Sequence, residues 1–213
     1  GLSAQTAEQV KKSIDLAIAG GVSHISMYAL TPEVGTPIYT DYLNGELLSD
    51  DETADIYDSA RAYLAEKGFY RYEVSNFAKP GFESRHNLNY WRRGEYIGLG
   101  VAASSFIDGI RFINTFSIDE YMNAIIYNKT PEISSDVIEG DDAKFEFIML
   151  GLRTAEGIDV SKYNAEFNAD FDMEYKSVLA EKDRFLERDG NRLKIKDEYL
   201  YVQNDIILEF MKG

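Results

Sequence analysis

The sequence predicts an α/β fold followed by a small, mainly helical module of the winged-helix type. The first observation is a helix–glycine–strand unit that occurs twice, at residues 9–30 and 52–74. The second is a change of pattern near Pro131, after which helices dominate, and the third is a β-turn-β signal at residues 189–195. Repeated helix–strand units favour a parallel sheet covered by helices. We therefore expect two domains, residues 1–130 and 131–213.

The first domain is expected to open with an amphipathic helix that is capped by Ser3 or Thr6 and ends at Gly20-Gly21. Short strands are expected at residues 22–30 and 69–74, with a helix over about 51–67 before the second strand. Because the carboxyl ends of parallel strands meet at one edge of a sheet, the loops after the two strands are expected to carry the site.

Further elements are expected along the rest of the chain. They are a β-prone stretch at 110–116 and helices at 118–127, 143–153, 160–167, 173–188 and near 203–211. An apolar stripe in the last segment is expected to be core of the small domain and not a cofactor site; it consists of Tyr199, Leu200, Tyr201, Val202, Ile206, Ile207 and Phe210.

Composition excludes several classes of function. The formal charge of −15 would repel a phosphate backbone, so we expect no nucleic-acid partner. The absence of cysteine excludes disulfides, thiolate metal ligands and cysteine nucleophiles. No apolar run reaches the roughly 20 residues of a membrane span, and no signal peptide opens the chain. The start at Gly1, without a methionine, is interpreted as that of a fragment, with a cytoplasmic parent protein.

The densest group of chemically useful side chains lies between Tyr72 and Trp91. This segment contains His86, which is one of two histidines, and the single tryptophan, Trp91. Such side chains offer a ligand nitrogen, amide hydrogen bonds and flat stacking surfaces. A structural loop, in which Trp91 fills a gap in the core and His86 bonds a carbonyl, is the alternative that the residues alone leave open.

Several motifs carry a resemblance to a known family. The segments 73–81 (EVSNFAKPG) and 86–91 (HNLNYW) resemble the YEISNFA and HNxxYW signatures of HemW-type proteins, which are radical S-adenosylmethionine relatives of oxygen-independent coproporphyrinogen III oxidase. Residues 24–37, 98–103 and 147–153 agree with the same family in the expected order. HNxxYW is the most specific of these motifs, because it separates HemW-type haem chaperones from true coproporphyrinogen oxidases.

The resemblance implies the C-terminal part of a partial (β/α) radical-SAM barrel, with a [4Fe–4S] cluster and S-adenosylmethionine as cofactors. The cluster would need a CxxxCxxC loop, which this chain lacks, so the fragment alone should be inactive. By similarity, Thr31, Gly98, Gly100 and Ser104 are expected to contact S-adenosylmethionine. Ser104 departs from the family, which usually has histidine there. A dinucleotide site at Gly98-x-Gly100-x-x-Ala103 is rejected, because a strand and not a helix is expected next.

For haem, the resemblance implies His86 as the axial iron ligand, with Tyr90 and Trp91 stacking on the porphyrin and Asn87 beside them. His24 lies in a strand whose other residues are expected to be core, so a structural role is favoured for it. Glu33 and Glu73 follow strands and are either polar site residues or solvated acids.

Three hypotheses of function follow. The first is a HemW-type haem-binding chaperone, with haem or porphyrin as ligand and a haemoprotein as acceptor. The second is an oxygen-independent coproporphyrinogen III oxidase, and the third is a non-enzymatic winged-helix module that binds protein. The sequence leaves open the acceptor, covalent or non-covalent haem binding, and the oligomeric state. Because a truncated barrel exposes a strand edge, we expect the chain to self-associate or to cover that edge with a terminal segment.

Overall fold

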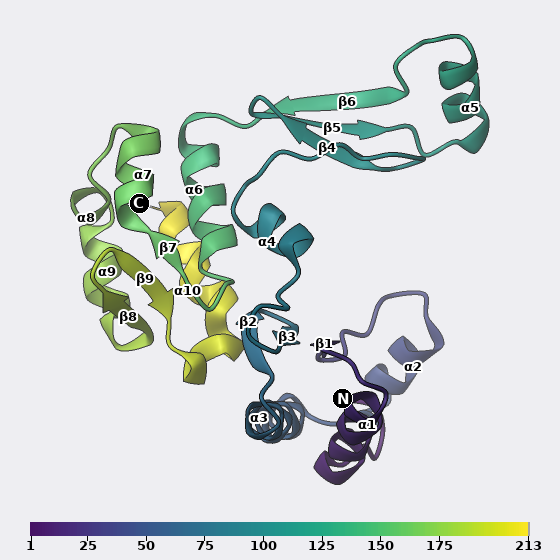
Figure 1. The fold of residues 1–213 in the computed structure, drawn as a ribbon, viewed down its shortest axis with the longest axis vertical. Coiled ribbons are helices and arrows are strands. Elements are labelled where there is room, and N and C mark those ends of the chain that lie inside the picture. Colours follow the sequence, from purple (N-terminus) through teal and green to yellow (C-terminus); the bar gives the residue numbers. More distant parts are fainter. Residues whose placement is uncertain (213) are drawn as a thin grey trace. The chain divides into compact units, whose positions relative to one another are not determined.

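The computed structural model describes residues 1–212, apart from the side chains of Tyr201 and Lys212, and it divides the chain into two compact units. The first unit is Gly1–Glu83, and the second begins at Ser84. Figure 1 shows the two units in purple to blue and in teal to yellow. The predicted domain boundary near residue 131 falls inside the second unit and stays a prediction.

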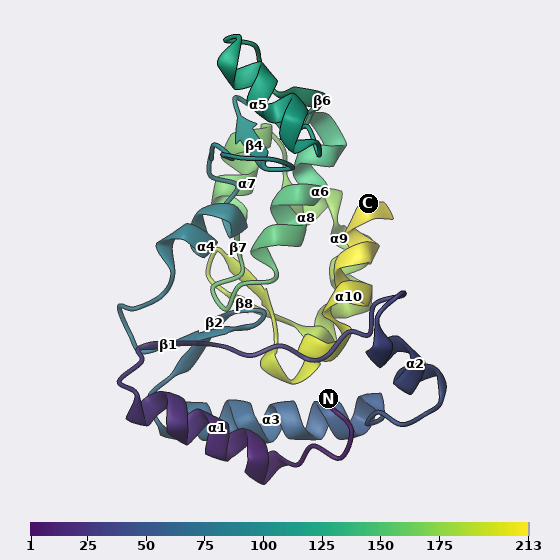
Figure 2. The same cartoon turned by 90° about the vertical axis from the view of Figure 1, so that its right-hand side faces the viewer.

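The first unit contains three helices and a three-stranded sheet. Its elements are α1 (Ala7–Ala19), β1 (His24–Ser26), α2 (Pro37–Leu43), α3 (Asp50–Glu66), β2 (Tyr70–Glu73) and β3 (Asn76–Ala78). Thr6 caps α1 and Ser49 caps α3, each in a reciprocal capping box with the residue three positions later. Helices α1 and α3 lie side by side (Figure 2) and form a core with the sheet through Ile14, Leu64 and Phe77. The region expected to be only a loop after Leu30 contains α2, which begins at Pro37.

The sheet of the first unit differs from the expected parallel sheet. Its strand order is β1-β3-β2, and β3 is antiparallel to both neighbours. The two expected strands therefore run in the same direction within one sheet, as predicted, but they are not adjacent. The tight turn Val74-Ser75 returns the chain between them, so the segment after Val74 is a hairpin and not a long functional loop. Strand β3 was not predicted, because a pattern of three residues is too short to distinguish a strand from a loop.

The second unit begins with a helix and a β-sheet, and a further helix connects the last two strands of that sheet. These elements are α4 (Arg85–Trp91), β4 (Ser104–Ile107), β5 (Ile110–Asn114), α5 (Ile118–Ile126) and β6 (Glu132–Val137). The strands form an antiparallel sheet in the order β4-β5-β6. Strand β6 was not predicted, because all six of its residues are exposed and its sequence shows no apolar alternation.

The rest of the second unit has the element order of a winged helix, as predicted. It consists of α6 (Gly140–Gly151), β7 (Ile158–Asp159), α7 (Val160–Phe167), α8 (Phe171–Glu174), α9 (Lys176–Lys182), η1 (Asp183–Phe185), β8 (Leu186–Asp189), β9 (Arg192–Ile195), η2 (Asp197–Val202), α10 (Gln203–Glu209) and η3 (Phe210–Lys212). The strands pair in the order β7-β9-β8 (Figure 1). The expected turn at Asp189-Gly190-Asn191 joins β8 to β9.

One core holds this module together. Ile148, Tyr163, Phe171, Leu193 and Phe210 are all buried within it. The predicted apolar stripe contributes as expected at Ile206, Ile207 and Phe210, whereas Val202 is exposed and the Tyr201 side chain lies outside the described residues.

The helix predicted over residues 173–188 is wrong in its second half. The helix is interrupted at Tyr175, which separates α8 from α9, and residues 186–189 form strand β8. Leu186 is buried and pairs with Ile195, so burial in the sheet overrides the helical propensity of the Leu-Glu-Arg sequence.

Candidate functional site

The HNxxYW segment is a short helix, α4, and not the loop that the sequence suggested. Ser84 caps this helix, and the Ser84 hydroxyl accepts a hydrogen bond from the backbone N–H of Asn87 at 3.2 Å. His86 and Tyr90 are one turn apart, which places them on the same face. Their rings lie 4.7 Å apart at an interplanar angle of 81°, and His86 is exposed. The helix therefore presents an accessible imidazole against the edge of an aromatic ring.

An aromatic chain holds Tyr90 in place. The Tyr90 ring lies 4.6 Å from that of Tyr96, which in turn packs beside Phe106 at 6.4 Å. Phe106 is buried in β4, and the backbones of Tyr96 and Phe106 exchange two hydrogen bonds of 2.9 Å. The side chain beside His86 is thus anchored in the sheet of the same unit.

Trp91 lies on a different face of α4 from His86. Five residues correspond to about 140° around a helix, so Tyr90 is beside the histidine whereas Trp91 faces another part of the unit. Asn87 precedes Trp91 by four residues and shares its face. Trp91 is half-buried and lines a pocket between α4, α6 and the start of α7.

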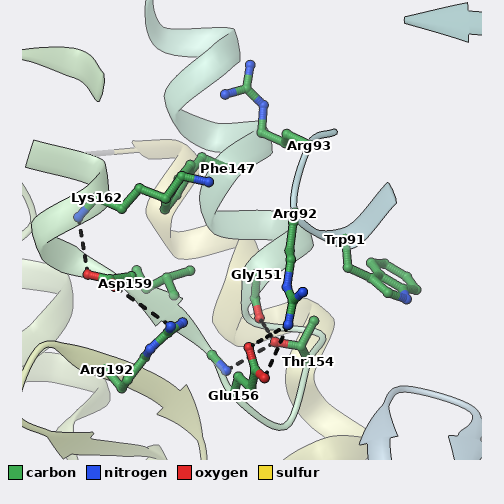
Figure 3. Close-up of a pocket in the computed structure, with 12 residues that line it drawn as sticks. Trp91, Arg92, Arg93, Phe147, Gly151, Thr154, Glu156, Asp159, Lys162 and Arg192 are labelled. Carbon is green, nitrogen blue, oxygen red and sulfur yellow. Dashed lines mark hydrogen bonds and ion pairs between the residues drawn. The ribbon is translucent and has the colours of Figure 1, made fainter. Parts of the chain in front are cut away.

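This pocket has a volume of about 160 Å³ and collects cations in an acidic chain. Arg92, Lys162 and Arg192 reach it from three different elements (Figure 3). Arg92 Nη2 lies 3.1 Å from one carboxylate oxygen of Glu156 and 3.2 Å from the other. Arg192 lies 3.7 Å from Asp159, which caps α7.

The remaining lining is partly aromatic. The Lys162 ammonium lies 5.9 Å from the centroid of the Phe147 ring, and no carboxylate is found within ion-pair distance of it in the described part of the chain. Three cations, Arg92, Lys162 and Arg192, therefore face two acids, Glu156 and Asp159. Sequence reasoning missed this site. Arg92 follows the HNxxYW motif directly, but no local signal connects it with Lys162 or Arg192.

A buried ion-pair cluster fixes the segment that follows α4. Glu146 of α6 is buried and lies 3.1 Å from Arg93 Nε and 2.7 Å from Arg111 Nη1. Arg93 also pairs with Glu166 of α7 at 2.6 Å. The hydrogen bond to Glu146 raises the pKa of Arg111 further above its ordinary value. The cluster joins α4, α6, α7 and the β4–β5–β6 sheet within the second unit.

The strand-end residues of the first unit form a polar network on the sheet face opposite Phe77. His24 Nε2 lies 2.9 Å from the Tyr72 hydroxyl, which satisfies this histidine within the structure. The Ser26 hydroxyl donates to Asn76 Oδ1 at 2.5 Å, and the Asn76 amide donates to Glu73. Glu73 is 2% exposed, so it is a buried network member and not a solvated acid. Glu33 is exposed.

The predicted S-adenosylmethionine contacts fall in two units. Thr31 is exposed after β1 in the first unit, and it does not line the pocket of about 100 Å³ that Met27, Ala29 and Tyr57 help to line. Gly98, Gly100 and Ser104 lie in the second unit, and the contact set stays a prediction.

The need for glycine at position 98 has a structural cause. A Cβ atom there would collide with the Ser104 carbonyl oxygen. The side-chain amide of Asn114 donates to the Gly100 carbonyl oxygen at 2.8 Å, and the backbone N–H of Gly100 donates to the Tyr121 hydroxyl at 3.0 Å. The absence of a side chain at Gly98 thus allows close approach of the protein's own backbone.

Residues 1–212 contain neither a preformed metal site nor a membrane-spanning helix. No cluster of three or more histidine or acidic side chains is arranged to hold a metal ion. No helix in this range combines the length and the apolar character needed to cross a bilayer.

Comparisons with known proteins agree with this fold. Residues 138–199 match the HemN C-terminal domain family. The E. coli radical SAM enzyme coproporphyrinogen III oxidase (HemN) superimposes with a TM-score of 0.74 at 18% identity, over 99% of this chain and 52% of that one. At this identity the likeness shows the fold alone. The chain therefore has the fold of the C-terminal portion of a HemN-type radical SAM protein.

Sequence similarity leads to the particular group. The chain is 32% identical to the haem chaperone HemW of Lactococcus lactis, over 99% of this chain and 56% of that protein. It is 30% identical to HemW of Bacillus subtilis, over 84% of this chain and 48% of the relative. The chain is thus related in sequence to the HemW proteins over nearly its whole length, and it spans about half the length of these relatives.

Proposed function

We propose that this chain is part of a HemW-type haem chaperone and that haem is its cargo. The observation that carries the proposal is the exposed His86, placed one helical turn from Tyr90 at a ring separation of 4.7 Å. Neutral imidazole is an ordinary axial ligand of haem iron. Haem brings four nitrogen ligands of its own, so one histidine is sufficient. The HemW relatives support the same assignment.

In this proposal, each side chain of α4 has a separate task. His86 donates its nitrogen lone pair to the iron. Tyr90 restricts the imidazole through its edge contact and covers apolar porphyrin surface. Asn87 and Trp91, on the neighbouring face, contact the edge of the porphyrin.

An oxygen-independent coproporphyrinogen III oxidase is the second candidate, and it is favoured by one observation, the structural likeness to HemN. The HNxxYW motif favours the chaperone. A protein-binding winged-helix module without cofactor chemistry is the third candidate. The charge of −15 disfavours nucleic acid as its target.

The family implies a [4Fe–4S] cluster and S-adenosylmethionine for the whole protein. This chain contains no cysteine, so it supplies no thiolate for the cluster. Thr31, Gly98, Gly100 and Ser104 remain proposed S-adenosylmethionine contacts. We expect the chain alone to have no S-adenosylmethionine cleavage activity.

We also propose a cellular location and partners for the protein. We place it in the cytoplasm, with an apo-haemoprotein as acceptor. Self-association of the chain is also proposed. It is supported by the unpaired edge of β6 and by the exposed apolar residues Ile118, Met122, Ile125 and Ile126 of α5.

Titration of haem into the chain and its His86→Ala variant tests the proposal. The variant should lose or shift the Soret band of the complex, because the iron loses its ligand. Folding should be unaffected, since His86 is exposed; circular dichroism checks this. His24→Asn is the matched control and should leave the band unchanged, because His24 bonds Tyr72. An unchanged spectrum and affinity in His86→Ala would refute the assignment.

A further inference from the structure

The pocket beside α4 combines positive charge with an apolar aromatic wall. Its cations come from the end of α4 (Arg92), from α7 (Lys162) and from β9 (Arg192), and they surround the space shown in Figure 3. Phe147 contributes the aromatic surface. In a chain of net charge −15, a lining in which these three cations face two acids, Glu156 and Asp159, is a local reversal of sign. Such a lining favours an anionic ligand with an apolar body.

The protein satisfies these cations only in part. Arg92 and Glu156 are both more than half exposed, so their pair is screened and can exchange partners at little cost. Arg192 lies 3.7 Å from Asp159, which is beyond a good hydrogen bond. Lys162 contacts the Phe147 ring and has no ion-pair partner among residues 1–212. At least one full positive charge is therefore available to a ligand.

The position of the pocket connects it with His86. Trp91 lines the pocket and is five residues from His86, which is roughly 7.5 Å along the helix axis and about 140° around it. Helix α4 ends at Trp91, and Arg92 follows as its C-cap. Carboxylate arms that extend past this helix end from a ring bound at His86 would meet Arg92 first.

From these observations we propose that the pocket binds the propionate carboxylates of the porphyrin, with Lys162 and Arg192 as the principal cations and Arg92 at the entrance. This inference rests on the proposed haem cargo and adds the recognition of its acidic side chains. Carboxylates form strong charge-assisted hydrogen bonds with arginine and lysine. The iron ligand and the acid pocket are then two independent contacts for one ligand.

Metal-free protoporphyrin IX and its dimethyl ester test the pocket without the iron bond. The chain should bind the diacid about tenfold more tightly than the ester, because the ester has no charge for the cations to pair. Lys162→Met combined with Arg192→Gln should abolish this preference by weakening diacid binding alone. Lys176→Met, on the exposed side of α9, is the matched loss of charge outside the pocket and should preserve the preference.

The outcomes separate the pocket from the iron site. Equal affinity for diacid and ester, or a preference that survives the double substitution, would overturn the pocket and leave the His86 assignment standing. A preference lost in the double variant, with an unchanged Soret band in His86→Ala, would support the pocket and refute the ligand. Failure of the folded chain to bind either porphyrin would overturn the pocket as well.

Discussion

The ring of Tyr90 meets the imidazole of His86 edge-on, 4.7 Å away and one turn later in α4. Both residues belong to the most specific motif of the sequence. Their contact exists because the motif is helical, which makes positions four residues apart neighbours. The aromatic position of the motif therefore orients the imidazole.

Substitution of Tyr90 should act on both stability and haem affinity. Tyr90→Ala removes contacts to His86 and Tyr96 and should lower the free energy of unfolding by about 1–3 kcal/mol. Haem affinity should fall while the Soret position is retained, since the iron ligand remains. Tyr90→Phe keeps the ring and should match the unsubstituted chain in urea unfolding and haem titration. Equal behaviour of the two variants would contradict the positioning role.

Loss of Glu146 should be far more costly than loss of Glu156. Glu146→Ala leaves the half-buried Arg111 without its carboxylate and Arg93 with Glu166 alone, which should cost about 3 kcal/mol or more. Glu156→Ala removes an exposed pair with Arg92 and should cost no more than about 1 kcal/mol. Urea unfolding of both variants measures the difference. Similar values would show that the buried cluster does not hold the second unit together.

Glycine should be indispensable at position 157. Its φ is +69°, and an added Cβ would collide with the Leu193 carbonyl oxygen of β9. Gly157→Ala should therefore destabilise the winged-helix module by about 2–4 kcal/mol, from overpacking together with the left-handed conformation. Gly190→Ala is the control, because its φ of +55° has the same conformational cost with open space around it. Thermal unfolding should show Gly157→Ala as the less stable variant by at least about 1 kcal/mol.

The chain should lose stability at alkaline pH through Tyr163. Burial, followed by the hydrogen bond with Tyr175, raises the pKa of Tyr163 well above its ordinary value of 10.0. Above pH 10 the unfolded chain releases this proton while the folded chain retains it. Stability therefore falls as the pH rises, by about 1.4 kcal/mol per unit for each such tyrosine.

Tyr163→Phe removes this contribution and should flatten the alkaline decline measured by urea unfolding from pH 9 to 11. At neutral pH the same variant should be less stable, because it loses hydrogen bonds to Glu174 and Tyr175. Tyr28→Phe, at a residue that is 69% exposed, should leave the profile unchanged. A decline of equal slope in all three chains would assign the effect to other groups.

Local sequence was sufficient wherever the deciding contacts span only a few residues. The Thr6 and Gly20 signals place α1, and the Asp189-Gly190-Asn191 turn places the β8–β9 hairpin. The motif at 86–91 also predicted the resemblance to HemW-type proteins, because its residue types and spacing are properties of the chain alone. Its helical form was missed, since a seven-residue helix depends on its Ser84 cap and on packing against α6.

Tertiary structure decided the rest, because those contacts join residues far apart in sequence. Insertion of β3 between β1 and β2 depends on pairing with His24–Ser26, some fifty residues earlier. The buried Glu146 selects Arg93 and Arg111 from separate elements, and the pocket collects Arg92, Lys162 and Arg192 in the same way. From sequence alone, a charged residue indicates only that its side chain is either exposed to solvent or paired with another group. The partner that it meets is determined by the packing of the core around it.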